Sequence, residues 1–213
     1  MMILSVRLLI GGVLRNVTME HVAGVMLLFS TWANVIFGLN ALAGRTIQSG
    51  SAIGPWNFNA ESFIRYTVRK NYSIAGWEFG NELCGSGVGT SVSANQYASD
   101  IAALRNIIHD VYRGIRHMPL VISPGGFYDA NWFQEFVNKS GKSVDVVSHH
   151  TYNLGPVAST FSGLKNILQK SATKAKAWVG EAGGAYNSGH HLVSDAFVYS
   201  FWYLDSAWNV SCL

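Results

Sequence analysis

Six short apolar segments alternate with amphipathic segments along the chain, and this alternation restricts its fold more than any other feature. Apolar runs bounded by Gly or Asn are typical of buried strands, and apolar residues three or four positions apart are typical of helices. The expected strands cover residues 6–12, 34–40, 74–81, 120–126, 145–152 and 177–184. The expected helices cover residues 61–71, 94–112, 131–138, 160–170 and 190–204. Alternating strands and helices predict βα units around a parallel sheet, and they argue against a β-sandwich or a helix bundle.

Two sheet arrangements are built from βα units, the open doubly wound sheet and the closed barrel. No GxGxxG or GxxxxGK[ST] motif follows any expected strand, and polar side chains cluster at the carboxyl ends of several strands. Both observations favour the barrel, whose chemistry lies at that rim. Eight units usually need about 250 residues, so 213 residues with six strands predict an incomplete (β/α)8 TIM-barrel-like fold, a single partial domain over residues 1–213.

Composition excludes several classes of protein. Charged residues make up 13% of the chain and apolar residues 49%, which excludes an intrinsically disordered chain. The net charge of +3 comes without a basic run, so no nucleic-acid partner is expected. Cys84 and Cys212 have no zinc-like spacing, and whether they pair is left open.

Two features bear on location. The apolar N-terminus contains Arg7 within its apolar run and is a poor signal peptide, whereas sequons at Asn16, Asn71, Asn138 and Asn209 permit a secreted glycoprotein. The uncharged stretch 22–43 is long enough for a membrane span of about 20 residues. Its internal polar residues favour a buried strand running into a loop, and the membrane anchor is kept as an alternative.

Two glutamates follow expected strands, Glu82 after GWEFGN and Glu181 within AWVGEAGG. The carboxyl ends of parallel barrel strands open on one rim, so these two acids are expected to face each other. Glycoside hydrolysis needs such a pair, and a separation of about 5–5.5 Å predicts a covalent intermediate and retained configuration. Glu78 points to the same side as Glu82 but about 13 Å deeper, at roughly 3.3 Å per residue. At this depth its carboxylate needs an ionic partner of its own, for which Arg45 and Lys176 are candidates.

A third strand end carries the segment SHHTYN, with His149, His150 and Tyr152. Its imidazoles and phenol are suited to positioning a substrate or hydrogen bonding to a nucleophile. A metal site built from one of the histidines and Glu181 is the weaker interpretation, because no HExxH or HxH spacing is present. Asn40 and Asn81 also end strands, where they are suited either to reading sugar hydroxyls or to capping the next helix.

The segments WEFGNELCGSGVG, VSHHTYNLGP and WVGEAGGAYNSGHHLVSDAF resemble the active-site segments of the heparanase family, glycoside hydrolase family 79, and its plant members above all. VIFGLNAL and VISPGGFYDANWF are also similar, so the resemblance extends from about residue 34 to residue 205. It implies a (β/α)8 barrel of a retaining clan with a small C-terminal β-domain. It implies that no metal or cofactor takes part.

The resemblance also assigns roles to individual residues. It implies Glu82 as the acid/base and Glu181 as the nucleophile. It implies that the substrate is bound by Asn81, Asn40, His149, Tyr152, Tyr186, Asn187 and Ser188, with the last three near the uronic-acid carboxylate. It leaves open which residue of the segment 149–152 faces the site.

The implied substrate is a β-glucuronide, such as a glucuronic-acid-containing glycan, and no obligate protein partner is expected. The implied location is secreted, in the cell wall, or in the lysosome or vacuole. The chain departs from the family in the short stretch 15–33 and in its end, SAWNVSCL, so the first and last strands and the β-domain are expected to be absent. A non-catalytic or glycan-binding protein of the same fold is therefore the alternative.

Overall fold

A computed structural model describes residues 5–8, 34–56, 60–152, 157–186, 189–202 and 204–205. Six strands form one sheet, in the order β1-β2-β5-β6-β7-β8. They are β1 (Ser5–Leu8), β2 (Asn34–Leu39), β5 (Ile74–Phe79), β6 (Leu120–Phe127), β7 (Val146–Thr151) and β8 (Lys176–Ala182). Each neighbouring pair is parallel. All six expected strands are confirmed, with shifts of a few residues at their ends.

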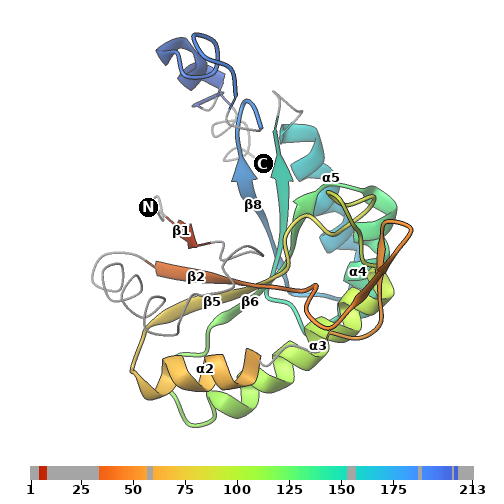
Figure 1. Ribbon diagram of the computed structural model, residues 1–213, viewed down its shortest axis with the longest axis vertical. Coiled ribbons are helices and arrows are strands. Elements are labelled where there is room, and N and C mark those ends of the chain that lie inside the picture. The colour runs from red at the N-terminus through yellow and green to blue at the C-terminus, as the bar shows by residue number, and fades with distance from the viewer. Residues whose placement is uncertain are drawn as a thin grey trace.

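The strand order follows the chain order without a reversal, and this decides between the two sheet arrangements. A doubly wound sheet reverses its order at a switch point, whereas a barrel adds each strand beside the previous one. The sheet is therefore part of an incomplete (β/α)8 barrel. Within the described residues, β1 and β8 are its two edges (Figure 1).

Four helices cover the outer face of this curved sheet (Figure 1). They are α2 (Ala60–Arg69), α3 (Ala94–Val111), α4 (Ala130–Ser140) and α5 (Val157–Lys170), and each packs against the next. Ser93 caps α3 by accepting a hydrogen bond from the Gln96 backbone, and Asp129 caps α4 in the same way from Trp132. These four helices confirm the predictions made from periodicity.

The main core lies between the sheet and the helices. Trp77 and Phe79 of β5 are fully buried: Trp77 packs against Phe37 of β2 and Phe63 of α2, and Phe79 packs against Tyr97 of α3. A smaller cluster on the concave face joins Ile36, Ile122 and Val146 with the partly buried Leu120 and Trp178. The second cluster occupies the position of a barrel interior, which side chains fill in layers.

Two parts of the chain differ from expectation. A short hairpin of β3 (Thr46–Gln48) and β4 (Ser51–Ile53) follows β2 and was not predicted. The helix expected over 190–204 is instead a series of turns over 191–195, a 3-10 turn at Phe197–Tyr199 and a short helical end. This segment projects from the molecule (Figure 1).

The proposed membrane stretch 22–43 falls largely on residues 22–33, which lie outside the described residues, and its end forms β2. Among the described residues, no helix combines the length and the hydropathy that crossing a bilayer requires.

Candidate active site

Glu82 lies directly beyond the carboxyl end of β5, in a tight turn. Gly80 has a φ of +76°, and a side chain there would collide with the Tyr97 hydroxyl, so the turn requires glycine at this position. Glu82 itself has a φ of 55°, and its backbone N–H donates to the Gly125 carbonyl at 2.6 Å. This hydrogen bond fixes the Glu82 turn to the end of β6.

Glu181 lies in β8, where it pairs in register with His150 of β7. The pairing shifts by one residue between His149 and His150, which marks a bulge. The Tyr152 hydroxyl donates to Oε2 of Glu181 at 2.9 Å. One carboxylate oxygen of Glu181 is therefore held by the Tyr152 phenol at the carboxyl end of the sheet.

The imidazole of His150 lies between the two glutamates. Its Nδ1 is 3.0 Å from Oε1 of Glu82 and 3.6 Å from Oε2 of Glu181. A carboxylate oxygen of Glu82 lies within 4.8 Å of one of Glu181. The His150 side chain is fully buried, and the two carboxylates are 18% and 19% exposed, so a substrate can reach both acids but not the imidazole from solvent. The structure thus brings together the two acids that the sequence selected.

This pair of carboxylates is suited to acid/base and nucleophilic chemistry. Retaining glycosidases hold their two carboxyl groups about 5–5.5 Å apart, while inverting enzymes need about 6.5–9.5 Å to admit a water. An oxygen separation within 4.8 Å agrees with the shorter spacing. The same three side chains, Glu82, His150 and Glu181, form the group within the described residues that has the donors for a divalent cation.

His149 points away from the glutamates. Its ring packs near Tyr128 and near Phe161 of α5, and its side chain is fully buried. Burial lowers the pKa of His149 to about 4, so the ring is neutral at pH 7. Its Nδ1 faces the His150 carbonyl at 3.5 Å, and its Nε2 finds no partner in the described part of the chain. Of the two adjacent histidines, the structure therefore brings His150, and not His149, to the acids.

The remaining predicted substrate residues do not form one cluster with the two glutamates. Asn81 is half-buried beside Glu82. Asn40 is exposed, and its Oδ1 accepts the Leu42 backbone N–H at 2.9 Å within a turn over residues 41–44, so it stabilises a turn and does not cap a helix. Tyr186 is 54% exposed in the segment after β8. Asn187 and Ser188 lie outside the described residues.

Glu78 is buried in β5, below Glu82, and Oε1 accepts a hydrogen bond from the Ser148 hydroxyl at 3.1 Å. Neither suggested ionic partner is found with it. Arg45 pairs with Asp100, and Lys176 begins β8 at the opposite end of the strands. Glu78 therefore contributes to the polar interior of the sheet and not to the pair of rim carboxylates.

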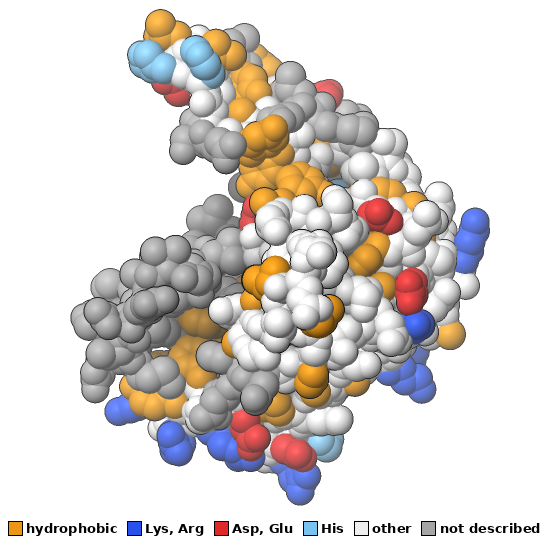
Figure 2. All heavy atoms as spheres, turned by 45° about the vertical axis from the view of Figure 1, so that its right-hand side comes forward, with side chains coloured by type: hydrophobic (Ala, Val, Ile, Leu, Met, Phe, Trp, Pro, Cys, Tyr) orange, Lys and Arg blue, Asp and Glu red, His pale blue; other side chains and the backbone are white. Residues whose placement is uncertain are grey.

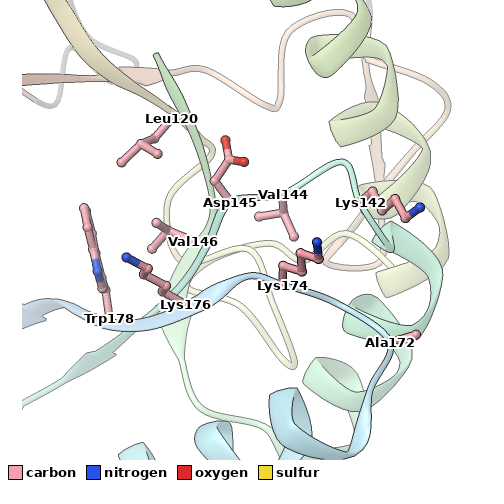
Figure 3. A pocket seen from close by; sticks show the side chains of 9 residues that line it. All are labelled: Leu120, Lys142, Val144, Asp145, Val146, Ala172, Lys174, Lys176 and Trp178. Carbon is pink, nitrogen blue, oxygen red and sulfur yellow. The ribbon is translucent and has the colours of Figure 1, made fainter. Parts of the chain in front are cut away.

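A pocket of about 540 Å³ opens at the amino ends of β6, β7 and β8 (Figure 3). It is lined by Leu120, Lys142, Val144, Asp145, Val146, Ala172, Lys174, Lys176 and Trp178. These residues begin the strands whose far ends carry the polar cluster. The pocket is therefore at the opposite end of the sheet from the glutamates.

Sequence reasoning missed two features of the rim. It named His149 and not His150 among the substrate residues, because alternation shows that adjacent histidines diverge but not which one faces the site. It did not select Phe127, the last residue of β6, whose ring lies 6.5 Å from that of His150 and 6.3 Å from that of Tyr152. Its place at a strand end, shared with Glu82, was the signal available in the sequence.

The chain is similar to known proteins over most of its length. The profile described as "Glycosyl hydrolase family 79, N-terminal domain" matches residues 12–207. Heparanase-like protein 3 of Arabidopsis thaliana is 57% identical over 195 residues, which cover 82% of this chain and 36% of that protein. Baicalin-beta-D-glucuronidase of Scutellaria baicalensis is 34% identical over 212 residues, covering 84% of this chain and 40% of that protein. The chain thus spans little more than a third of the length of these relatives.

Among solved structures, a GH39 β-xylosidase from Caulobacter crescentus superimposes with a TM-score of 0.56. The match covers 98% of this chain and 59% of that one, at 17% sequence identity. At this identity, the similarity concerns the fold alone, and it agrees with the strand order described above.

Proposed function

The chain belongs to glycosyl hydrolase family 79, and on this basis we propose that it is a retaining glycoside hydrolase that cleaves β-glucuronosyl linkages. The observation that carries the proposal is the separation of the Glu82 and Glu181 carboxylates, within 4.8 Å at one rim of the barrel. That spacing suits a double displacement. The substrate class is supported by relatives whose names include a heparanase-like protein and a β-D-glucuronidase.

In the first step, Glu181 attacks the anomeric carbon while Glu82 donates a proton to the glycosidic oxygen. The bond between that carbon and the leaving oxygen breaks, and a glucuronosyl ester of Glu181 forms. Glu82, now a carboxylate, accepts a proton from a water molecule, and the oxygen of that water attacks the anomeric carbon. The ester bond breaks, Glu181 is released as a carboxylate, and the sugar leaves with its original configuration.

The neighbouring polar groups support these roles. The Tyr152 hydroxyl holds one oxygen of Glu181 and so orients this carboxylate for attack. Asn81 is proposed to hold a sugar hydroxyl beside Glu82, and Asn40 to line an earlier strand end. Tyr186, with Asn187 and Ser188, is proposed to receive the uronic-acid carboxylate. No metal or cofactor is required by this scheme.

Labelling with a 2-deoxy-2-fluoroglucuronosyl fluoride tests the proposal, because the fluorine slows release of the ester. The wild-type chain should gain the mass of one sugar on the peptide that contains Glu181, and it should release the β anomer from a chromogenic glucuronide. Glu181→Ala should abolish labelling and Glu82→Gln should abolish hydrolysis of substrates with poor leaving groups. Glu61→Gln, an exposed glutamate of α2, is the matched control. Labelling that persists in Glu181→Ala contradicts the assignment of the nucleophile.

Glycan binding without hydrolysis is the second candidate. It is favoured by the two sheet edges, β1 and β8, that remain within the described residues, because barrel closure fixes active-site geometry. Binding of a glucuronide without labelling or turnover would support this candidate. For location, we propose a glycosylated protein that is secreted or resides in the cell wall, lysosome or vacuole. The asparagines of the sequons at Asn71 and Asn138 are exposed. The test is a shift in the electrophoretic mobility of the protein isolated from its source after an enzyme has removed N-linked glycans.

A further inference from the structure

Phe127 is an exposed aromatic residue in an otherwise buried strand. Residues 121–126 of β6 are all buried, whereas Phe127, at its carboxyl end, is 40% exposed. The strand lies between β5, which leads to Glu82, and β7, which carries His150. Phe127 therefore occupies the rim between the elements that hold the two acids.

The backbone around Phe127 is fixed to the turn of Glu82. The Cys84 thiol donates to the Phe127 carbonyl at 3.2 Å, and burial raises the pKa of this thiol to about 12, so it remains a neutral donor. A side chain at Gly126 would lie 3.0 Å from Cα of Glu82. The absence of a side chain there lets the turn pack closely on β6. Phe127 and Glu82 are thus held as one unit.

The ring of Phe127 also contacts the groups that hold the acids. Its centroid lies 6.5 Å from that of His150 and 6.3 Å from that of Tyr152, with interplanar angles of 79° and 64°. Edge contacts of this kind orient an aromatic ring without covering all of it. The exposed part of the ring is therefore held at the rim beside His150 and Tyr152, and the backbone of Phe127 is joined to the turn of Glu82, the acid that faces the leaving group in the proposed reaction.

Cationic side chains are scarce at this rim. Among the Lys and Arg residues whose side chains the structure describes, Arg45 follows a strand of the large sheet, and it is buried in an ion pair with Asp100. The others lie in helices, in the turns that lead from a helix to a strand, or at the start of β8, hence on the outer face or at the opposite end. Sulfate esters are recognised through Arg and Lys. A sulfated chain would instead meet Glu82, Glu181 and Asp129.

We propose that Phe127 is the floor of the leaving-group subsite, and that this subsite accepts an uncharged ring with an apolar face and rejects sulfated polyanions. This inference rests on the proposed glucuronidase function, and it adds the class of leaving group. An aryl aglycone and an unsulfated sugar share the required chemistry, since either presents an apolar face to the phenyl ring. The single carboxylate of the uronic acid is received elsewhere, near Tyr186.

The test compares three glucuronides on the full chain. They are p-nitrophenyl glucuronide, an unsulfated glucuronosyl-N-acetylglucosamine disaccharide and its 6-O-sulfated form. The wild-type chain should cleave both uncharged substrates with a higher kcat/KM than the sulfated one. Phe127→Ala should lower kcat/KM on the two uncharged substrates by about 3- to 10-fold, and Phe127→Leu by less. Phe127→Arg should reduce the difference in kcat/KM between the unsulfated and the sulfated disaccharide.

Labelling by a glucuronosyl fluoride separates this inference from the proposed function, because fluoride presents no ring to the subsite. Phe127→Ala should lose less in labelling rate than it loses in kcat/KM on the two uncharged substrates, and labelling of the variant also shows that it is folded. Phe197→Ala removes a more exposed phenylalanine from the projecting segment and serves as the control. If the wild-type chain is neither labelled nor active, both proposals are wrong. If it is labelled, but prefers the sulfated disaccharide or is unaffected by Phe127→Ala, the subsite inference alone is wrong.

Discussion

Nδ1 of His150 lies 3.0 Å from Oε1 of Glu82, although 68 positions separate the two residues and β6 lies between their strands. The same atom is 3.6 Å from Oε2 of Glu181. One buried imidazole therefore contacts both carboxylates, and its position influences the distance between them.

Replacing His150 with Phe should lower kcat by about 100-fold, because a displacement of about 1 Å in a catalytic group costs that much. The phenyl ring keeps most of the buried volume but cannot hydrogen bond to Glu82. Steady-state kinetics on a chromogenic glucuronide measure the effect. His149→Phe is the matched control, since that ring faces the helices. A His150→Phe enzyme within a few-fold of wild type would show that the imidazole does not position the acids.

Replacing Tyr152 with Phe should lower kcat by about 10- to 100-fold, as expected when a hydrogen bond to a charged group is lost. The Tyr152 hydroxyl donates to Glu181 at 2.9 Å, and without it this carboxylate is less well oriented. Rates of labelling by the glucuronosyl fluoride should fall in parallel. Tyr72→Phe, in the connection between α2 and β5, provides the control. Unchanged labelling in Tyr152→Phe would rule out this role.

Replacing Gly126 with Ala should impair activity more than stability. The new Cβ would lie 2.6 Å from Sγ of Cys84 and 3.0 Å from Cα of Glu82, so the Glu82 turn must shift. We expect a loss of about 100-fold in kcat and of about 1–3 kcal/mol in the free energy of unfolding.

Adding Cys84→Ala to this variant removes the closer of the two contacts. Stability, measured by urea denaturation, should then partly recover, while activity stays low because the contact with Glu82 remains. Full activity in Gly126→Ala would show that the turn tolerates displacement.

The strands, and the closeness of Glu82 and Glu181 at one end of the sheet, could be predicted from the sequence for a shared reason. Each strand is a compact apolar run, and in a parallel sheet all carboxyl ends lie on one side, so Glu82 and Glu181 were expected together. The choice between His149 and His150 was beyond sequence reasoning. It depends on which face of β7 lines the barrel interior: Val146, Ser148 and His150 alternate onto that face, where Val146 joins the smaller cluster and Ser148 donates to Glu78.

The helix expected over 190–204 shows a second limit of periodicity. Its apolar residues are spaced as for a helix, yet Leu192, Phe197 and Leu204 are 78%, 83% and 61% exposed. Helices gain most of their stability from packing of the apolar face, and these side chains are not covered by the described residues. Figure 2 shows hydrophobic atoms at the surface of the projecting part of the molecule. The hairpin of β3 and β4 escaped prediction because its strands are only three residues each and mostly exposed.

Replacing Arg45 with Met should lower the free energy of unfolding by about 3–5 kcal/mol, because the buried Asp100 carboxylate loses its counter-ion. The side chains of this pair are 0% and 6% exposed, and Asp100 also accepts hydrogen bonds from Gln96 and Trp56. Urea denaturation measures the effect.

Two further variants sharpen this prediction. Arg45→Met combined with Asp100→Leu should recover much of the loss, since no unpaired charge is then buried. Arg65→Met, which breaks an exposed pair with Glu61, should cost less than about 1 kcal/mol. Equal losses for Arg45→Met and Arg65→Met would contradict the buried ion pair.

The buried, neutral His149 should make the protein sensitive to acid. Its pKa is lowered to about 4 by burial, against about 6.5 in the unfolded chain, so between these values the unfolded state binds more protons than the folded state. Stability is then present in full above pH 6.5 and is lost as the pH falls toward 4. At 1.36 kcal/mol per pH unit, this amounts to about 3 kcal/mol. His149→Phe keeps the contacts with Tyr128 and Phe161 and has nothing to titrate, so its free energy of unfolding should fall less between pH 7 and pH 4. Denaturation curves at several pH values measure the difference, and equal slopes for both proteins would show that His149 is already charged or solvated in the fold.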